Sequence, residues 1–115
     1  MLILMNQGEV LLEKRPAPGI WGGLWCFPEA AIGEDVAAAC ELRFGAMIDS
    51  IEQLPAVEHG FTHFSLTIKP QRLRVRELRS RAAECAVAWL SKEQVRVAAI
   101  PAPVKRIVEL LASDE

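Results

Sequence analysis

Alternation of apolar and polar residues predicts the strands of this chain. Apolar residues fill Met1–Met5 and return in Val10–Lys14 after a polar Asn-Gln-Gly stretch. Because Gly8 tolerates the positive φ that tight turns need, the two runs are expected to pair as a β-hairpin. The clearest half-buried strand is Phe64–Lys69, where apolar and polar residues alternate strictly. This pattern puts Phe64 on the inward face, so we expect its ring in the core.

Helical spacing occurs in two places. The alanine run favours a helix over Glu34–Phe44, with Glu34 and Asp35 in its first turn, where the helix dipole favours negative charge. Gly45 is a suitable C-terminal stop. In Val104–Leu111, with Pro103 before it, apolar residues at i, i+3, i+4 and i+7 form one helix face. Three less regular segments are predicted to be extended: Cys26–Pro28, Ser50–His59 and Ala86–Leu90. A further strand is expected to resume at Leu73 and Val75. Ala82–Glu84 is predicted to be a loop, and Ser91–Gln94 a capped turn of helix.

Strands mixed with two main helices predict an α+β fold, in which the helices pack on a mixed sheet. With 115 residues, 51% of them hydrophobic, residues 1–115 are expected to form one domain with its own core. The chain opens directly in a strand, which suggests a domain taken from a longer protein. No apolar run approaches the roughly 20 residues of a membrane span, so no membrane association is expected.

Charge and cysteine content narrow the possible functions. A net charge of −2 lacks the overall basic character of nucleic-acid binders, so any DNA contact must come from a local patch or a neighbouring domain. Cys26, Cys40 and Cys85 are widely spaced, which favours reduced thiols in the core and a cytoplasmic location. A cubane iron–sulfur cluster normally needs about four cysteine ligands, so this chain cannot hold one alone.

The stretch Gly19–Glu29 combines two tryptophans with three glycines. Paired glycines mark positive φ or close backbone approach, so this stretch is predicted to be a loop with one fixed shape. Trp21 and Trp25 are either stacking platforms for a base or apolar contacts that hold the loop. The flanking glycines favour the second role, because they need packing to fix them. His59, at a strand end, is also expected to be structural.

Within this loop, Gly23–Glu29 matches the Gly-x5-Glu opening of the Nudix box, and the order of hairpin, loop and helix resembles a Nudix domain. The box should continue as Arg-Glu-(apolar)-x-Glu-Glu-x-Gly, whereas Ala37–Phe44 retains only Glu41. Nudix hydrolases hold Mg²⁺ with helix carboxylates, and Ala38 and Leu42 offer no oxygen ligand. We therefore expect no metal site and no catalytic residue. The alternative is an active Nudix pyrophosphohydrolase with a rearranged metal site, acting on a nucleoside triphosphate or a related substrate.

A narrower family shares longer stretches. Leu11–Glu29 closely resembles the C-terminal domain of adenine DNA glycosylases of the MutY type, and His59–Phe64 and Ala98–Val104 agree in the same order. The resemblance implies a Nudix-like α/β/α sandwich that helps to recognise 8-oxoguanine paired with adenine in duplex DNA during base excision repair. It assigns the catalytic acid and an iron–sulfur cluster to an N-terminal helical domain, the partner of this one. This domain alone is then expected to be non-catalytic and to need no cofactor.

The family has a Phe-Ser-His loop that reaches toward the lesion, and Phe61–His63 is the matching segment. Thr62 replaces the serine but keeps a hydroxyl, which can accept from the N–H of 8-oxoguanine at N7, where guanine has an acceptor. His63 can donate or accept a hydrogen bond, and Phe61 can wedge beside unstacked bases. Gly60 allows close approach of the loop to DNA. The resemblance thus makes these four residues the candidate lesion-binding site.

Basic residues are candidates for phosphate contacts. Lys14 and Arg15 lie beside the aromatic loop, and Arg72 and Arg74 share one face of a strand. Each pair either contacts phosphates, with salt-sensitive binding, or belongs to a solvated surface. A third hypothesis makes the arginines of Arg72–Arg81 part of a surface for a clamp or repair protein.

Overall fold

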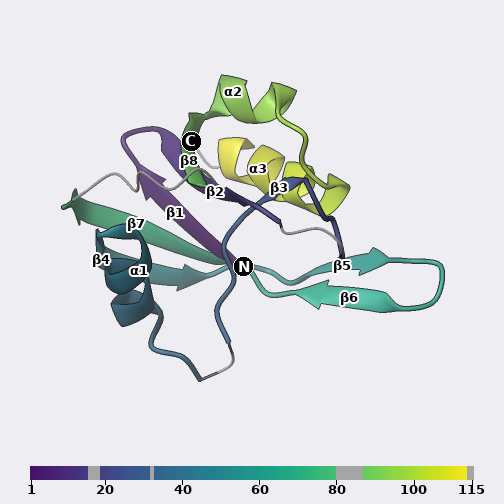
Figure 1. The fold of residues 1–115 in the computed structure, drawn as a ribbon, viewed down its shortest axis with the longest axis horizontal. Coiled ribbons are helices and arrows are strands. Elements are labelled where there is room, and N and C mark those ends of the chain that lie inside the picture. The colour runs from purple at the N-terminus through teal and green to yellow at the C-terminus, as the bar shows by residue number, and fades with distance from the viewer. Residues whose placement is uncertain (16–18, 32, 80–86, 114–115) are drawn as a thin grey trace.

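The computed structural model describes residues 1–15, 19–31, 33–79 and 87–113 (Figure 1). Its elements are β1 (Leu2–Asn6), β2 (Glu9–Lys14), β3 (Trp25–Cys26), α1 (Val36–Phe44), β4 (Ala46–Gln53), β5 (Val57–Gly60), β6 (Ser65–Ile68), β7 (Gln71–Leu78), β8 (Val87–Ser91), α2 (Lys92–Val97) and α3 (Ala102–Ser113). None of the helices formed by these residues is long and apolar enough to cross a membrane.

The main sheet is mixed and has β1 near its centre. Its strand order is β3-β2-β1-β7-β4, and β8 pairs with β2. β1 is antiparallel to β2, as the predicted hairpin requires, and parallel to β7, with Leu2 opposite Gln71 and Met5 opposite Arg74. β5 and β6 form a separate antiparallel ribbon, which projects from the body of the domain in Figure 1.

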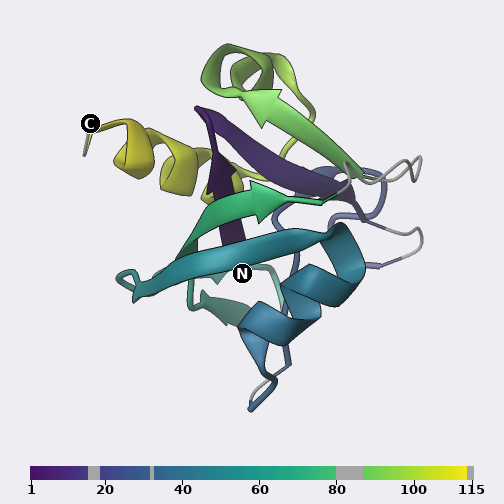
Figure 2. The same ribbon diagram turned by 90° about the vertical axis from the view of Figure 1, so that its left-hand side faces the viewer.

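Side chains of β1 are buried alternately in two cores. Leu2 and Leu4 pack in one cluster with Phe44 of α1, whereas Ile3 packs in the other with Ile107 of α3. Figure 2 shows the corresponding layers, with α1 on one side of the sheet and α3 on the other. A strand buried on both faces needs apolar residues at every position, which explains the continuous apolar run at the N-terminus. The predicted α/β/α sandwich is therefore confirmed.

Helix α1 begins later than its sequence predicts. Asp35 is the N-cap, where its carboxylate accepts a 3.1 Å hydrogen bond from the Ala38 N–H, so neither Glu34 nor Asp35 lies in the first turn. The prediction missed this start because an aspartate favours two positions near a helix N-terminus. In the first turn it complements the helix dipole, and at the N-cap it accepts a hydrogen bond from an unpaired backbone N–H. Gly45 ends the helix as predicted, with φ of 66° and its N–H donating to the carbonyls of Cys40 and Glu41.

The extended structure predicted over Ser50–His59 is confirmed only in part, because the segment is not one continuous strand. This region contains the end of β4 and most of β5, which belong to different sheets. Pro55 lies between them, and proline cannot donate a hydrogen bond to a ladder, so the chain leaves one sheet there and enters the other. β7 does resume directly after Pro70, and Ser91 caps α2 through a capping box with Gln94. Helix α3 extends beyond the predicted Val104–Leu111 at both ends.

The remaining predicted segments have mixed outcomes. Cys26–Pro28 begins in β3, and all three of its residues are buried. β8 agrees with the predicted Ala86–Leu90 strand over its described part. Ala86, the loop at Ala82–Glu84 and Cys85 lie outside the described residues.

Phe64 is not a core residue, contrary to the alternation in its segment. The residue is 48% exposed, whereas Leu66 is half-buried and Ile68 is 5% exposed. On this face of the ribbon, exposure thus increases from Ile68 through Leu66 to Phe64, because the buried cluster lies at the base of the ribbon. Alternation shows which side chains lie on the same face of a strand. It does not show whether the core extends as far as each of them.

A matched pair of leucine truncations tests the position of the core. Leu4 is fully buried at the centre of the sheet, and Leu42 is 88% exposed on α1. We expect Leu4→Ala to lower the free energy of unfolding by about 2–5 kcal/mol, through lost burial and the cavity it leaves. Leu42→Ala should change it by no more than about 0.5 kcal/mol. Urea titration of both variants measures the difference, and similar costs would contradict the described core.

Candidate nucleic-acid interface

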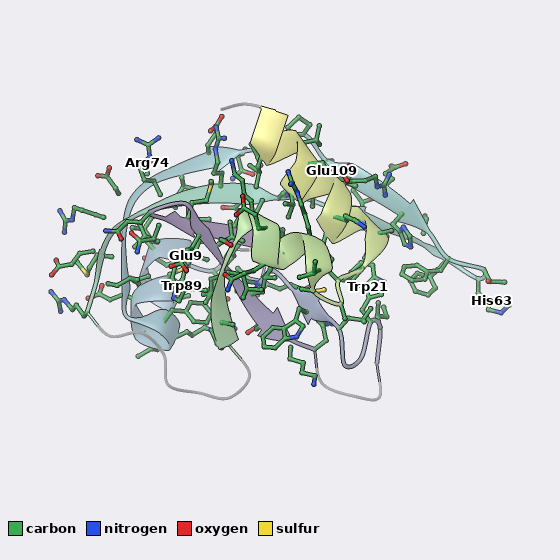
Figure 3. The ribbon with its side chains drawn as sticks, turned by 90° about the horizontal axis from the view of Figure 1, so that it is seen from above. Glu9, Trp21, His63, Arg74, Trp89 and Glu109 are labelled. Carbon is green, nitrogen blue, oxygen red and sulfur yellow. The ribbon has the colours of Figure 1, made fainter. Side chains whose placement is uncertain are left out.

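The candidate lesion-binding residues form the tip of the β5–β6 ribbon. Gly60 pairs with Ser65, and the Phe61 N–H donates a 2.7 Å hydrogen bond to the Phe64 carbonyl, which closes the loop. Thr62 and His63 are exposed between these two phenylalanines, and Figure 3 shows His63 at the outer end of the ribbon. The four residues selected from sequence therefore lie together at a projecting surface.

Four aromatic rings connect this loop to the body of the domain. The Phe61 ring centroid lies 4.5 Å from that of Phe64, with the planes 20° apart, and 4.7 Å from that of His59 in an edge-on arrangement. Trp21 lies 5.8 Å from Phe61 and 5.9 Å from His59. Aromatic pairs at such distances add about 0.5–1.5 kcal/mol beyond the area they bury. The cluster therefore holds the ribbon tip in a defined position.

Trp21 reaches the ribbon from the aromatic–glycine loop through an unusual backbone conformation. Its φ is 57°, in the left-handed region that non-glycine residues seldom occupy. Its carbonyl accepts a 3.0 Å hydrogen bond from the Leu24 N–H, which closes a turn around the glycine pair. The half-buried Trp21 ring also packs against the core on the α3 side. These contacts agree with the structural role predicted for this tryptophan, and they give His59 the same role.

Arg15 shapes the aromatic–glycine loop, a role that its sequence context did not predict. Its guanidinium forms a 3.2 Å ion pair with Glu29 and donates a 3.4 Å hydrogen bond to the Ile20 carbonyl. Its backbone N–H donates to Leu24, and its carbonyl accepts from Gly23, each over 2.9 Å. Arg15 thus interacts with Ile20 near the start of the loop and with Gly23, Leu24 and Glu29 in its later part.

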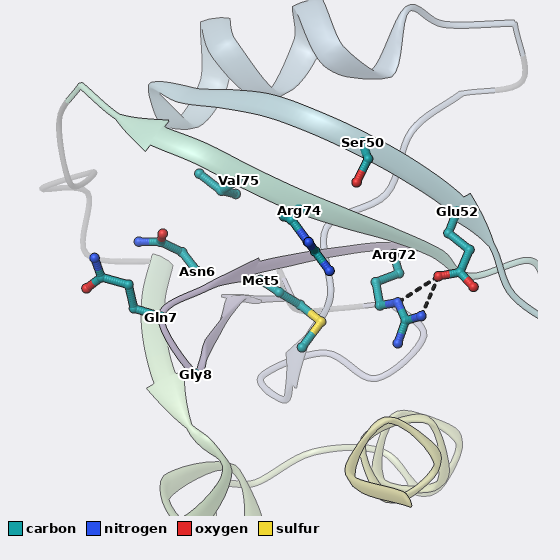
Figure 4. A pocket seen from close by; sticks show the side chains of 9 residues that line it. All are labelled: Met5, Asn6, Gln7, Gly8, Ser50, Glu52, Arg72, Arg74 and Val75. Atoms are coloured by element: carbon teal, nitrogen blue, oxygen red, sulfur yellow. Dashed lines mark hydrogen bonds and ion pairs between the residues drawn. The ribbon is translucent and has the colours of Figure 1, made fainter. Parts of the chain in front are cut away.

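Arg72 and Arg74 belong to β7 in the main sheet, whereas the ribbon tip belongs to the separate β5–β6 sheet. In Figure 3, Arg74 and His63 are at opposite ends of the view. Both arginines line a pocket of about 470 Å³ beside the β1–β2 turn, and Arg72 donates a 3.0 Å hydrogen bond from Nε to Glu52 (Figure 4). The other lining residues are Met5, Asn6, Gln7, Gly8, Ser50, Glu52 and Val75. The structure therefore separates these two predicted phosphate contacts from the candidate lesion-binding residues.

The family model for the NUDIX domain matches residues 1–110. The chain belongs to the Nudix domain family.

Relatives of this Nudix domain include an adenine DNA glycosylase. Adenine DNA glycosylase of Buchnera aphidicola subsp. Baizongia pistaciae (strain Bp) is 26% identical over 107 residues, which cover 93% of this chain and 30% of that protein. The chain therefore spans less than a third of the length of this curated relative.

Solved structures share the same fold. The C-terminal domain of mouse MUTYH, solved in complex with human PCNA, has a TM-score of 0.75 and 21% identity, covering 98% of this chain and 85% of that one. A NUDIX hydrolase from Nitrosomonas europaea has a TM-score of 0.70 and 12% identity, covering 98% and 86%. The predicted resemblance to the C-terminal domain of adenine DNA glycosylases is confirmed by these relatives.

Residues at the Nudix box do not fit the magnesium site of a Nudix hydrolase. Glu29 is paired with Arg15, and Glu41 lies 3.8 Å from Arg79. On the neighbouring strand, Glu13 is paired with Arg43 over 3.1 Å. Within the described ranges, no group of three or more His, Cys, Asp or Glu side chains is placed to hold a metal ion. Among the described residues, Glu29 and Glu41 are thus each paired with an arginine rather than gathered around a common centre.

Two cysteines near the box are buried thiols. Burial raises the pKa of Cys26 to about 11, and the Arg15 guanidinium partly offsets this rise. Burial also raises the pKa of Cys40 to about 11, again against a smaller opposing effect from Arg43. Both side chains belong to the apolar clusters, as the sequence predicts for reduced core cysteines.

Alkylation tests the environment of these two thiols. Only the thiolate reacts with iodoacetamide, and a raised pKa lowers its population at pH 8. We expect Cys26 and Cys40 to stay unmodified in the folded protein at pH 8 and to react fully in concentrated urea. Peptide mass mapping measures each site. Reaction of either cysteine in the folded protein at the rate seen in urea would contradict its burial.

Proposed function

We propose that this chain is the lesion-recognition domain of an adenine DNA glycosylase, and that it recognises 8-oxoguanine paired with adenine in duplex DNA. The observation that carries the proposal is the loop at the end of the β5–β6 ribbon. Its polar residues are exposed, its base is held by an aromatic cluster, and its sequence matches the lesion-facing loop of that glycosylase family. The adenine glycosylase relative supports the same assignment.

Thr62 and His63 supply hydrogen-bonding groups that suit the oxidised base. Guanine has an acceptor at N7, whereas 8-oxoguanine has an N–H there, so a hydroxyl oxygen at Thr62 distinguishes the two bases by accepting. His63 contacts the base or an adjacent phosphate. A side chain at Gly60 would meet nothing within 4 Å in the chain itself, which leaves that space for the DNA backbone.

Because the net charge of the chain is −2, attraction to the DNA phosphates must come from basic side chains that lie close to the bound DNA. Lys14 is exposed beside the aromatic–glycine loop, and Arg15 is half-buried within it. We assign these two to phosphates near the lesion. Arg72 and Arg74 reach the same duplex only if it follows the long axis of the domain, which measures 41 Å. That length corresponds to about 12 base pairs at about 3.4 Å per step.

Adenine removal belongs, in this proposal, to an N-terminal helical domain of the intact protein. That domain would carry the catalytic acid and the iron–sulfur cluster, and the present domain would contribute binding alone, without a cofactor or a catalytic residue. We assign the protein to the cytoplasm, where buried cysteines such as Cys26 and Cys40 stay reduced.

Substitution of the loop tests lesion recognition. In a full-length glycosylase carrying this domain, we expect Phe61→Ala with His63→Ala to reduce the preference for adenine opposite 8-oxoguanine over adenine opposite guanine by about 5- to 30-fold. This fold-change corresponds to the free energy of about one or two hydrogen bonds between the loop and the oxidised base. Single-turnover excision rates on both duplexes measure the preference. Thr67→Ala, exposed on the same ribbon, is the control, and an unchanged preference in the double variant would disprove the assignment.

A turnover assay tests the alternative of an active Nudix pyrophosphohydrolase. Because the box carboxylates are few and paired with arginines, we expect no magnesium-dependent hydrolysis of nucleoside triphosphates or 8-oxo-dGTP by the isolated chain. Release of pyrophosphate or phosphate over a substrate panel is the measurement. Turnover that disappears in the Glu41→Gln variant would overturn this part of the proposal.

A further inference from the structure

The two phenylalanines at the ribbon tip differ in how much ring surface is open to a ligand. Phe61 has three aromatic neighbours, Trp21, His59 and Phe64, with centroids within 5.8 Å. Phe64 stacks on Phe61 through one face and is 48% exposed. Stacking on a nucleobase requires an open ring face. Phe64 offers such a face, whereas the surroundings of Phe61 suit a supporting residue.

We propose that Phe64 is the residue that stacks on DNA, and that its ligand is a nucleobase unstacked from the duplex beside the lesion. The inference rests on the proposed function. In this inference Phe64 contacts the base and Phe61 supports the Phe64 ring. Trp21 and His59 in turn hold Phe61 in place.

Preorganisation favours this assignment. A ring that is already ordered by a stacked neighbour loses little conformational freedom when it binds. The hydrogen bond between the Phe61 N–H and the Phe64 carbonyl fixes the backbone on both sides of the loop. Because Trp21 packs against the core as well as against Phe61, the support extends from the core to the tip.

Neighbouring groups favour a base over an apolar protein surface as the ligand. Thr62 and His63, which are exposed beside Phe64, place hydrogen-bonding groups next to the stacking face. Proteins bind unstacked bases by this combination of an aromatic face and polar contacts to the base edge. Among the exposed large apolar side chains of the described residues, Phe64 alone is aromatic. A single ring beside polar groups differs from the broad apolar patch of a protein interface.

Binding of the isolated chain to two fluorescein-labelled duplexes tests the inference. One duplex contains 8-oxoguanine opposite adenine, the other contains guanine opposite adenine, and anisotropy at low salt gives each dissociation constant. We expect Phe64→Ala to weaken binding to the 8-oxoguanine duplex by about 5- to 100-fold, the usual effect of removing one base-stacking ring. Phe64→Trp should retain affinity. Leu110→Ala removes another exposed apolar side chain and should leave affinity unchanged.

The outcomes separate this inference from the proposed function. If the wild-type chain prefers the 8-oxoguanine duplex and Phe64→Ala binds as tightly as wild type, Phe64 is not the contact residue and the inference is wrong. If the wild type binds without preference, or does not bind, the proposed function fails and the inference fails with it. If Phe64→Ala instead abolishes self-association measured by sedimentation, the ring contacts a second copy, which also overturns the inference.

Discussion

Burial of β1 on both faces is the constraint on which the rest of this domain depends. Its alternate side chains join separate clusters, so neither helical layer can form its core without this strand. The N-terminal end of the same strand holds two loops. The Leu2 N–H donates to the Pro28 carbonyl over 2.7 Å, and the Met1 carbonyl accepts from the Gln71 N–H over 2.9 Å. The aromatic–glycine loop and the segment that leaves the β5–β6 ribbon therefore meet at one end of β1.

This meeting point explains how Trp21 reaches His59 and Phe61. The residues are distant in sequence, but the loop of Trp21 is bonded to the start of β1 at Pro28, and the ribbon is followed by Gln71, which is bonded there as well. A further contact holds the ribbon from the other side, because Arg106 of α3 donates a 3.3 Å hydrogen bond to the Glu58 carbonyl. The position of the candidate lesion-binding loop thus derives from backbone hydrogen bonds and core packing, which are stronger constraints than exposed ion pairs of about 0–1 kcal/mol.

Charged residues of the Nudix box have a different role in this domain. Arg15 and Arg43 are paired with carboxylates at the loop and at β2. Arg43 also donates a 3.2 Å hydrogen bond to the Glu29 carbonyl, which connects α1 to the end of the loop. Glu13, Glu29 and Glu41 each lie next to a guanidinium group. Charged side chains of this region therefore stabilise the loop and its connection to α1.

Local chemistry made part of this arrangement predictable. β1, β2 and the body of α1 follow from apolar periodicity and from glycines at their ends, because these signals act over a few residues. Phe61–His63 is contiguous, so a family resemblance was sufficient to select it. The role of Arg15 and the Trp21 cluster were not predictable, because each depends on contacts between segments that only the folded sheet brings together. The split at Pro55 was predictable in principle from its missing N–H.

The error at Phe64 shows why the ribbon tip suits recognition. Alternation alone would bury this ring, but the core ends near Ile68, and exposure rises from there to the tip. Substitutions beyond the core change few buried contacts, so they have small effects on stability. Residues at the tip are therefore free to vary with the ligand while β1 preserves the fold. Phe64 is 48% exposed although it stacks on Phe61, and a binding role gives a physical reason for an aromatic ring there.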